Sequence, residues 1–220
     1  MDEVAVLTGD IVNSRNLSEE SRVRLYKTFP QLSKNILRLY PQDVTYPMSN
    51  FRGDSWQLVV NRPQKSLKIS LYIRLYICFT FGAEKLDTRI AIGIGKVNFV
   101  PTENVSAGDG PAFLASGHLL ESFKSERMAI AFSEKKELAE RIGLDNMIGL
   151  LDHIVTGWSP SQCQAVFWSL QGLNQKEIAA HWQPKAISQA AVSKSLRNTG
   201  LTQIMQSLSL FESLFAKSSI

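Results

Sequence analysis

The chain has 220 residues, of which 44% are hydrophobic and 20% are charged. This composition is typical of a globular protein and excludes the collagen-like, intrinsically disordered and disulfide-scaffold classes. Its net charge of +4 at pH 7 allows an anionic partner but does not require one.

Strands and helices alternate up to residue 157 in the predicted order β-α-β-β-α-β-α-β-α. Strands are predicted from short β-branched, apolar runs bounded by turn residues, and helices from apolar residues spaced three and four apart. The expected strands cover residues 4–7, 44–51, 55–60, 88–97 and 128–132. The expected helices cover residues 18–40, 67–81, 112–123 and 134–154. The first six elements have the order of a ferredoxin-like fold, so we predict an α+β domain of that kind.

Some residues inside these elements carry specific expectations. Pro30 is expected to kink the first helix or to begin a second one. Gly93 and Gly95 predict that another backbone or a ligand lies close to the fourth strand. The helix at 67–81 is the most apolar stretch, but it is short and contains Arg74, so we expect a buried core helix rather than a membrane span.

The cysteines and the start of the chain indicate a cytoplasmic protein. Cys78 and Cys163 lie far apart, and neither has a second cysteine or a histidine at a spacing typical of a metal site. Unpaired cysteines are typical of a reducing compartment. The first residues lack the positively charged segment of a secretory signal. We therefore expect a cytoplasmic location and no association with a membrane.

A break in the pattern at residues 157–160 (GWSP) predicts a boundary between two domains. We expect residues 1–157 to form the α+β domain and residues 158–220 to form an all-helical second domain. The second part holds five cations and two anions, so its net charge is +3, whereas that of the first part is only +1. The basic character is thus concentrated in the helical tail.

Two aspartates form the first candidate site. Asp10 follows the first strand, Asp54 lies in the hairpin turn, and a ferredoxin-like sheet places those strands side by side. Two carboxylates on adjacent strand ends suit Mg²⁺ or Mn²⁺, which could bridge phosphates. The backbone amides of residues 11–14 could receive phosphate oxygens. The alternative is that both Gly-Asp pairs are plain turns, because such short motifs recur freely.

Four ordered motifs resemble the SatD family of bacterial proteins and, more distantly, the class III nucleotidyl cyclase catalytic domain. The motifs are TGDIVNSR at 8–15, RGDSWQ at 52–57, RIAIGIG at 89–95 and DGPAF at 109–113. The cyclase-like part covers about residues 4–132. The resemblance further implies that a DNA-binding helix-turn-helix follows, as it often does in the SatD family.

The same resemblance implies that Asp10 and Asp54 hold Mg²⁺ or Mn²⁺ and that a purine nucleotide binds beside them. Ile11 would lend a backbone carbonyl, and the segment after it would face the triphosphate. Asn50 lies near the position that reads the purine in cyclases, where they carry a lysine. Arg15 and Arg52 could contact phosphate. The implied nucleotide-binding residues are Asp10, Ile11, Val12, Asn13, Ser14, Arg15, Asn50 and Asp54.

The sequence departs from catalytic cyclases on the helix after the Gly-rich loop. Catalytic members carry an Asn and an Arg there, which orient the ribose and stabilise the transition state. Residues 111–118 (PAFLASGH) contain neither, and His118 is a weak substitute because it is mostly neutral at pH 7. We therefore expect a degenerate domain that senses a nucleotide. The alternatives are a nucleotidyl cyclase or related metal-dependent nucleotide enzyme, and an interaction module with an inactive pocket.

Residues 174–180 and 187–196 resemble a helix-turn-helix, with a connection at 181–186 about three residues longer than the usual form. Polar and basic side chains on the second helix could reach base edges and phosphates in a major groove. The alternative is a helical bundle that contacts another protein. The expected DNA-binding residues are Lys176, Ser188, Gln189, Ser193, Lys194 and Arg197.

The last helix, after Gly200, has an apolar stripe with helical spacing. This stripe either packs on its own domain or forms the seam of a dimer. Taken together, the sequence predicts a cytoplasmic bacterial transcriptional regulator that is a homodimer. Its expected partners are double-stranded DNA and a nucleotide ligand.

Overall fold

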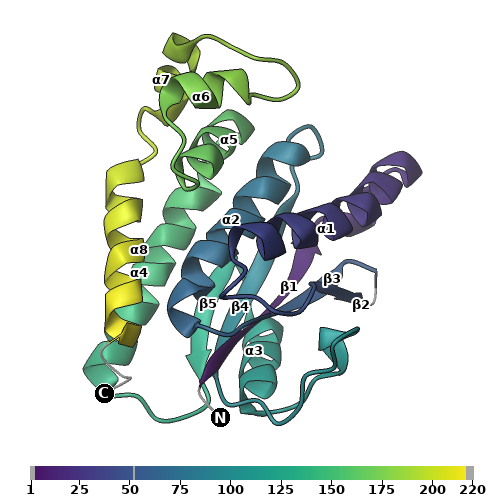
Figure 1. Ribbon diagram of the computed structural model, residues 1–220, viewed down its shortest axis with the longest axis vertical. Coiled ribbons are helices and arrows are strands. Elements are labelled where there is room, and N and C mark those ends of the chain that lie inside the picture. Colours follow the sequence, from purple (N-terminus) through teal and green to yellow (C-terminus); the bar gives the residue numbers. More distant parts are fainter. Residues whose placement is uncertain (1–2, 52, 217–220) are drawn as a thin grey trace.

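A five-stranded sheet forms the centre of the computed structural model, which describes residues 3–51 and 53–216 (Figure 1). The strands are β1 (Val4–Val12), β2 (Ser49–Phe51), β3 (Ser55–Val60), β4 (Asp87–Gly95) and β5 (Met128–Phe132). Their order in the sheet is β2-β3-β1-β4-β5. Neighbouring strands are antiparallel except β4 and β5, which are parallel.

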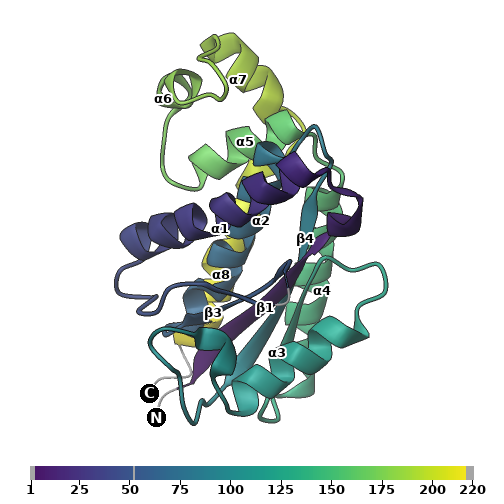
Figure 2. The same ribbon diagram turned by 90° about the vertical axis from the view of Figure 1, so that its right-hand side faces the viewer.

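The described residues form eight α-helices. They are α1 (Glu19–Leu39), α2 (Ser66–Thr80), α3 (Pro111–Ser122), α4 (Leu138–Thr156), α5 (Pro160–Ser169), α6 (Gln175–Ala180), α7 (Gln189–Leu196) and α8 (Leu201–Ala216). Figure 2 shows the sheet between α1 and α2 on one side and α3 on the other. Helices α6 and α7 lie at one end of the molecule, opposite the end where β1 begins and α8 ends (Figure 1).

The expected mixed α+β class is confirmed, but some elements differ in length. Strand β1 continues to Val12, so Asp10 lies inside the strand and not after it. Hydrogen bonds to β3 on one side and β4 on the other hold β1 extended beyond its apolar run. Helix α1 runs through Pro30 without a break, so the expected second helix start is wrong. Helix α4 is likewise continuous through Gly143.

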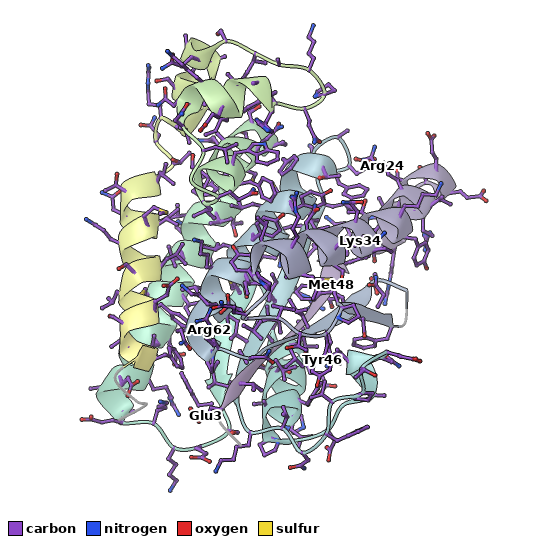
Figure 3. All side chains as sticks on the ribbon, in the orientation of Figure 1. Glu3, Arg24, Lys34, Tyr46, Met48 and Arg62 are labelled. Atoms are coloured by element: carbon purple, nitrogen blue, oxygen red, sulfur yellow. The ribbon has the colours of Figure 1, made fainter. Side chains whose placement is uncertain are left out.

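The first strand of the hairpin is much shorter than expected. Strand β2 begins only at Ser49, because the preceding segment is bound to α1 instead. The backbone N–H of Met48 donates to Ser33 Oγ of α1 at 2.9 Å (Figure 3). A backbone donor used in this way is lost to strand pairing.

One apolar core joins the sheet to helices from both parts of the chain. It holds residues of α1, α2 and α4 together with Phe167 of α5 and Phe211 of α8. A smaller cluster lies between the other face of the sheet and α3. Helices α6 and α7 have their own cluster around Val192. The expected division into residues 1–157 and 158–220 stays a prediction.

The apolar stripe of α8 is buried within the chain. Ile204, Leu208, Phe211 and Phe215 all pack into the main core. Glu212 of the same helix forms an ion pair of 2.7 Å with Lys65, which lies just before α2. The stripe therefore packs on its own chain, and the homodimer stays a prediction.

No helix in the described part of the chain combines the length and the apolar character needed to cross a bilayer. The most apolar stretch is instead α2, which lies in the core between the sheet and α5.

Gly93 lets α3 lie directly against β4, as its position in the strand suggested. A Cβ at this residue would lie 2.5 Å from the backbone nitrogen of Ser116 and would also clash with the carbonyl oxygen of Ala112. Both clashes are with helix backbone, which cannot move aside without shifting α3.

Replacing Gly93 with alanine should lower the free energy of unfolding by about 1–3 kcal/mol, the usual range for overpacking. Gly117, which lies in the interior of α3, provides the control because an added Cβ there meets nothing within 4 Å. Its replacement by alanine should raise the free energy of unfolding by about 0.5–1 kcal/mol. Urea unfolding of the two variants measures both effects, and equal stabilities would contradict the close approach.

Candidate functional site

Asp10, the first candidate aspartate, forms an ion pair with Arg89. The register of β1 against β4 puts the two residues directly opposite each other. Arg89 Nε donates to Asp10 Oδ1 at 2.8 Å, and Arg89 Nη2 donates to Asp10 Oδ2. These hydrogen bonds raise the pKa of Arg89 above its usual value. Both carboxylate oxygens of Asp10 are therefore engaged by a cation of the neighbouring strand.

Asp54, the second candidate aspartate, lines a pocket of about 280 Å³. Its Oδ2 accepts a hydrogen bond from Ser14 Oγ. Arg15, Arg22 and Tyr26 line the same pocket. Two exposed arginines and a hydroxyl around one carboxylate can hold an anionic group such as a phosphate.

The two aspartates lie close enough to act on the same arginine, since the charges of Asp10 and Asp54 both raise the pKa of Arg89. No group of three or more His, Cys, Asp or Glu residues that could hold a metal occurs in residues 3–51 and 53–216. A Mg²⁺ or Mn²⁺ ion on Asp10 would use the oxygens that Arg89 already occupies. Arg89 therefore competes with such an ion for Asp10, and the metal stays a prediction.

Replacing Arg89 with glutamine should strengthen Mn²⁺ binding about tenfold, because it removes the cation that competes for Asp10. Titration of the protein with Mn²⁺, followed by the electron paramagnetic resonance signal of the free ion, measures the affinity. Arg38→Gln is the matched control, because Arg38 is exposed on α1 and lies outside the pocket of Asp54. Weaker binding by the Arg89 variant than by the wild type would contradict this competition.

The segment after Asp10 divides between two environments. Ile11 is buried in the main core, so only its backbone could face a ligand. Val12 and Asn13 line a second pocket, which has no lining residue in common with the pocket of Asp54. Ser14 and Arg15 line the pocket of Asp54. Arg52 lies outside the described residues.

Asn50 lies apart from Asp10. It is exposed in β2, and the register pairs it with Trp56, which in turn pairs with Gly9. Side chains in register share one face of a sheet, and consecutive residues of a strand point to opposite faces. Asn50 therefore lies on the face of Trp56, opposite the face that carries Asp10. Trp56 itself is fully buried in the main core.

The second candidate site lies on α6 and α7. Asn174 begins α6 with a capping box that includes Glu177, and Ser188 begins α7 by accepting from the N–H of Ala191. Ile178 of α6 and Val192 of α7 lie in one apolar cluster between the two helices. Residues 181–188 connect the two helices. The paired helices thus have a fixed apolar side and leave an outer side to solvent.

The residues expected to contact DNA all lie on that outer side. They are exposed, and they are Lys176, Ser188, Gln189, Ser193, Lys194 and Arg197. None of the three basic side chains forms an ion pair within the described ranges. The one acid of α6, Glu177, is committed to the cap of its own helix. The three basic side chains outnumber this one acid, so the face carries a net positive charge.

A buried charge cluster, absent from the sequence-based expectations, joins α2, β4 and α4. Arg74 is 1% exposed. It donates to Asp87 at 2.9 and 2.8 Å, to Asp152 at 2.5 Å and to Thr156 at 2.7 Å. Burial alone would lower the pKa of Arg74, but the charges and hydrogen bonds of the two aspartates outweigh burial and raise it. The signal in the sequence is an arginine within a helix that is apolar on all sides. A charged side chain is buried in such a helix only when a group of opposite charge pairs with it, so Arg74 could have indicated this cluster.

The comparison with protein families agrees with the ordered motifs. The model of the SatD family matches residues 4–211. No curated protein matches the sequence. Since the family match covers both the sheet and the helical tail up to Phe211, this chain belongs to the SatD family.

Proposed function

We propose that the chain is a DNA-binding transcriptional regulator of the SatD type, in which α6 and α7 form a helix-turn-helix. The observation that carries the proposal is the two-sided character of α7. Val192 is fully buried in the cluster with α6, while Gln189, Ser193, Lys194 and Arg197 are exposed. A helix held from behind by a second helix, with polar and basic side chains outward, suits a major groove.

The charge distribution supports the same proposal. Lys176, Lys185, Lys194 and Arg197 face solvent at the end of the molecule that carries α6 and α7 (Figure 1). Glu212, the other acid of the tail, is paired with Lys65, which lies just before α2. The local positive charge would bind the phosphate backbone and release counterions. A helical bundle for protein contact needs no such excess.

The sheet domain is proposed to sense a nucleotide and not to turn it over efficiently. The strand order β2-β3-β1-β4, with one helix between β1 and β2 and another between β3 and β4, supports a ferredoxin-like, cyclase-like arrangement. The pocket of Asp54, Ser14 and Arg15 is the proposed site for the phosphates. Helix α3 offers no Asn or Arg, which favours binding over catalysis.

The enzyme alternative makes a different prediction for the same residues. Incubation of the protein with ATP or GTP and Mn²⁺ distinguishes the enzyme from the sensor. Turnover that is abolished by Asp10→Ala would favour a nucleotidyl cyclase or a related enzyme. Binding of the nucleotide without turnover would favour the sensor. An interaction module with an inactive pocket would show no nucleotide-dependent rise in melting temperature, because any ligand specific to the folded state must raise it.

A mobility-shift assay with the DNA upstream of the protein's own gene tests the proposed function. The expected result is a complex that weakens steeply as salt increases, since each phosphate contact contributes about 0.9 to the slope of log K against log salt. A fragment from within the coding region is the matched control for sequence preference. No complex with either fragment at low salt would overturn the proposal.

A further inference from the structure

A second pocket, of about 390 Å³, lies where the sheet meets the start of the helical tail. Its walls come from the end of β1, the turn between α2 and β4, the segment before β5, and the junction of α4 with α5. Figures 1 and 2 both show the end of α2 beside α5. This pocket shares no lining residue with the pocket of Asp54. It is therefore a separate site, and it does not depend on the proposed function.

The pocket has one wall that is fixed and charged. Arg74, Asp87 and Thr156 line it, and all three belong to the buried charge cluster. Every donor bond of Arg74 goes to Asp87, Asp152 or Thr156 at 2.5–2.9 Å. Four of the five N–H groups of Arg74 are thus used within the cluster, so this wall mainly supplies shape.

Two other cations of the pocket remain available. Lys85 is exposed, and its side chain makes no hydrogen bond or ion pair within the described residues. Arg127 approaches Asp87 only to 3.9 Å, which is outside hydrogen-bond distance, and otherwise bonds backbone carbonyls through Nη1. The lining residues and Asp152 together carry one positive charge in excess. Lys85 and the donors of Arg127 that are not used within the chain thus suit an anion.

The backbone at the rim of the pocket is strained. Asn13 and Lys85 adopt left-handed conformations, with φ of 64° and 54°, and both line the pocket. This conformation costs a non-glycine residue free energy, and residues held in it concentrate at ligand sites and active sites. The left-handed backbone at Lys85 thus occurs at the residue that carries the one unpaired ammonium group among the lining residues.

The remaining surface is apolar and includes an indole. Leu86 and Val155 are buried beneath the pocket, and Trp158 is partly exposed to it. No hydrogen bond of Trp158 Nε1 occurs within the described part of the chain. An indole beside aliphatic side chains is a surface against which a planar ring can lie, and Lys85 and Arg127 line the same pocket.

We propose that this pocket binds a small aromatic anion, with its ring against Trp158, Leu86 and Val155 and its carboxylate or phosphate between Lys85 and Arg127. Gly82, which closes the pocket at the end of α2, cannot carry a Cβ, because that atom would lie 2.7 Å from Pro160 of α5. The close contact keeps the two helix ends together and so preserves the shape of the site.

Calorimetric titration of the full chain tests the proposal with 2-naphthoate, 2-naphthyl phosphate, neutral 2-naphthol and inorganic phosphate. Stoichiometric binding of a naphthyl anion, at least tenfold tighter than that of 2-naphthol and of phosphate alone, is expected. Which anion binds more tightly distinguishes a carboxylate from a phosphate ligand. Equal affinity for the neutral ring, or no binding of either anion, would overturn the proposal.

Two further measurements tie binding to the site. Lys85→Gln should weaken the preferred anion about tenfold, and Lys85→Glu should weaken it further, because each removes the unpaired cation. Lys34→Gln is the matched control, since Lys34 is exposed on α1 (Figure 3) and outside the pocket. The indole N–H signal of Trp158, assigned with Trp158→Phe, should shift on binding. Unchanged affinity in both Lys85 variants, or an unshifted signal, would overturn the assignment.

Discussion

Replacing Arg74 with methionine should lower the free energy of unfolding by about 3–5 kcal/mol, the range for breaking a buried ion pair by removing one partner. Arg74 is almost fully buried, and it binds Asp87 and Asp152 from different elements. Asp152 is also buried, at 8% exposed, and accepts a further bond from the backbone N–H of Arg127. Methionine fills much of the volume but leaves two carboxylates without their cation.

Urea unfolding of the wild type and the variant measures the change, when both curves are fitted with the same dependence of the free energy of unfolding on urea concentration. Lys96→Met is the control, because Lys96 and Glu134 form an exposed pair at 3.4 Å with side chains 57% and 61% exposed. Its loss should cost less than about 1 kcal/mol. A loss at Arg74 as small as that at Lys96 would show that the cluster is not a stabilising centre of the fold.

The combined substitution of Lys194 and Arg197 by glutamine should weaken DNA binding about 10- to 100-fold at moderate salt. Both side chains are exposed on the outer side of α7 and have no partner within the described residues. Each lost phosphate contact should reduce the salt slope by about 0.9, so the pair should reduce it by about 1.8. Fluorescence anisotropy of a labelled duplex over a range of salt concentrations measures both quantities.

The matched control for this pair is Lys34→Gln with Arg38→Gln, which removes the same two charges from the exposed side of α1. Both double variants lower the net charge of the protein by two. A difference in their DNA affinity therefore shows which surface contacts the DNA. Equal losses of affinity would mean that DNA contacts the protein elsewhere or only through its net charge.

Features that depend on a single residue or a short local pattern could be predicted from the sequence. Ser18 begins the helix expected at residues 18–40, and its side chain caps α1 by accepting from the N–H of Ser21, because caps are chosen locally. Gly93 indicated a close backbone approach, and the structure confirms it. A cap depends on residues that are near in the sequence. The close approach at a glycine can be predicted without knowing which residue lies against it.

Features that depend on strand register could not be predicted. Asp10 meets Arg89 only because β1 and β4 pair in one particular register, and Asn50 is separated from Asp10 for the same reason. A shift of one residue would exchange the faces of every side chain. The partners of Arg74 lie 13 and 78 residues away along the chain, so only the packing of α4 and β4 on α2 brings them together.

The most direct test of the account is a photo-crosslink from α7 to DNA. Ala190, which is small and exposed on the outer side of α7, can be replaced by p-benzoylphenylalanine, and Leu114, exposed on α3, by the same residue as a control. After irradiation with duplex DNA, the protein carrying the group at residue 190 should be crosslinked to the DNA. The protein carrying it at residue 114 should not. A crosslink from residue 114 with none from residue 190 would contradict the assignment of α7 as the helix that meets DNA.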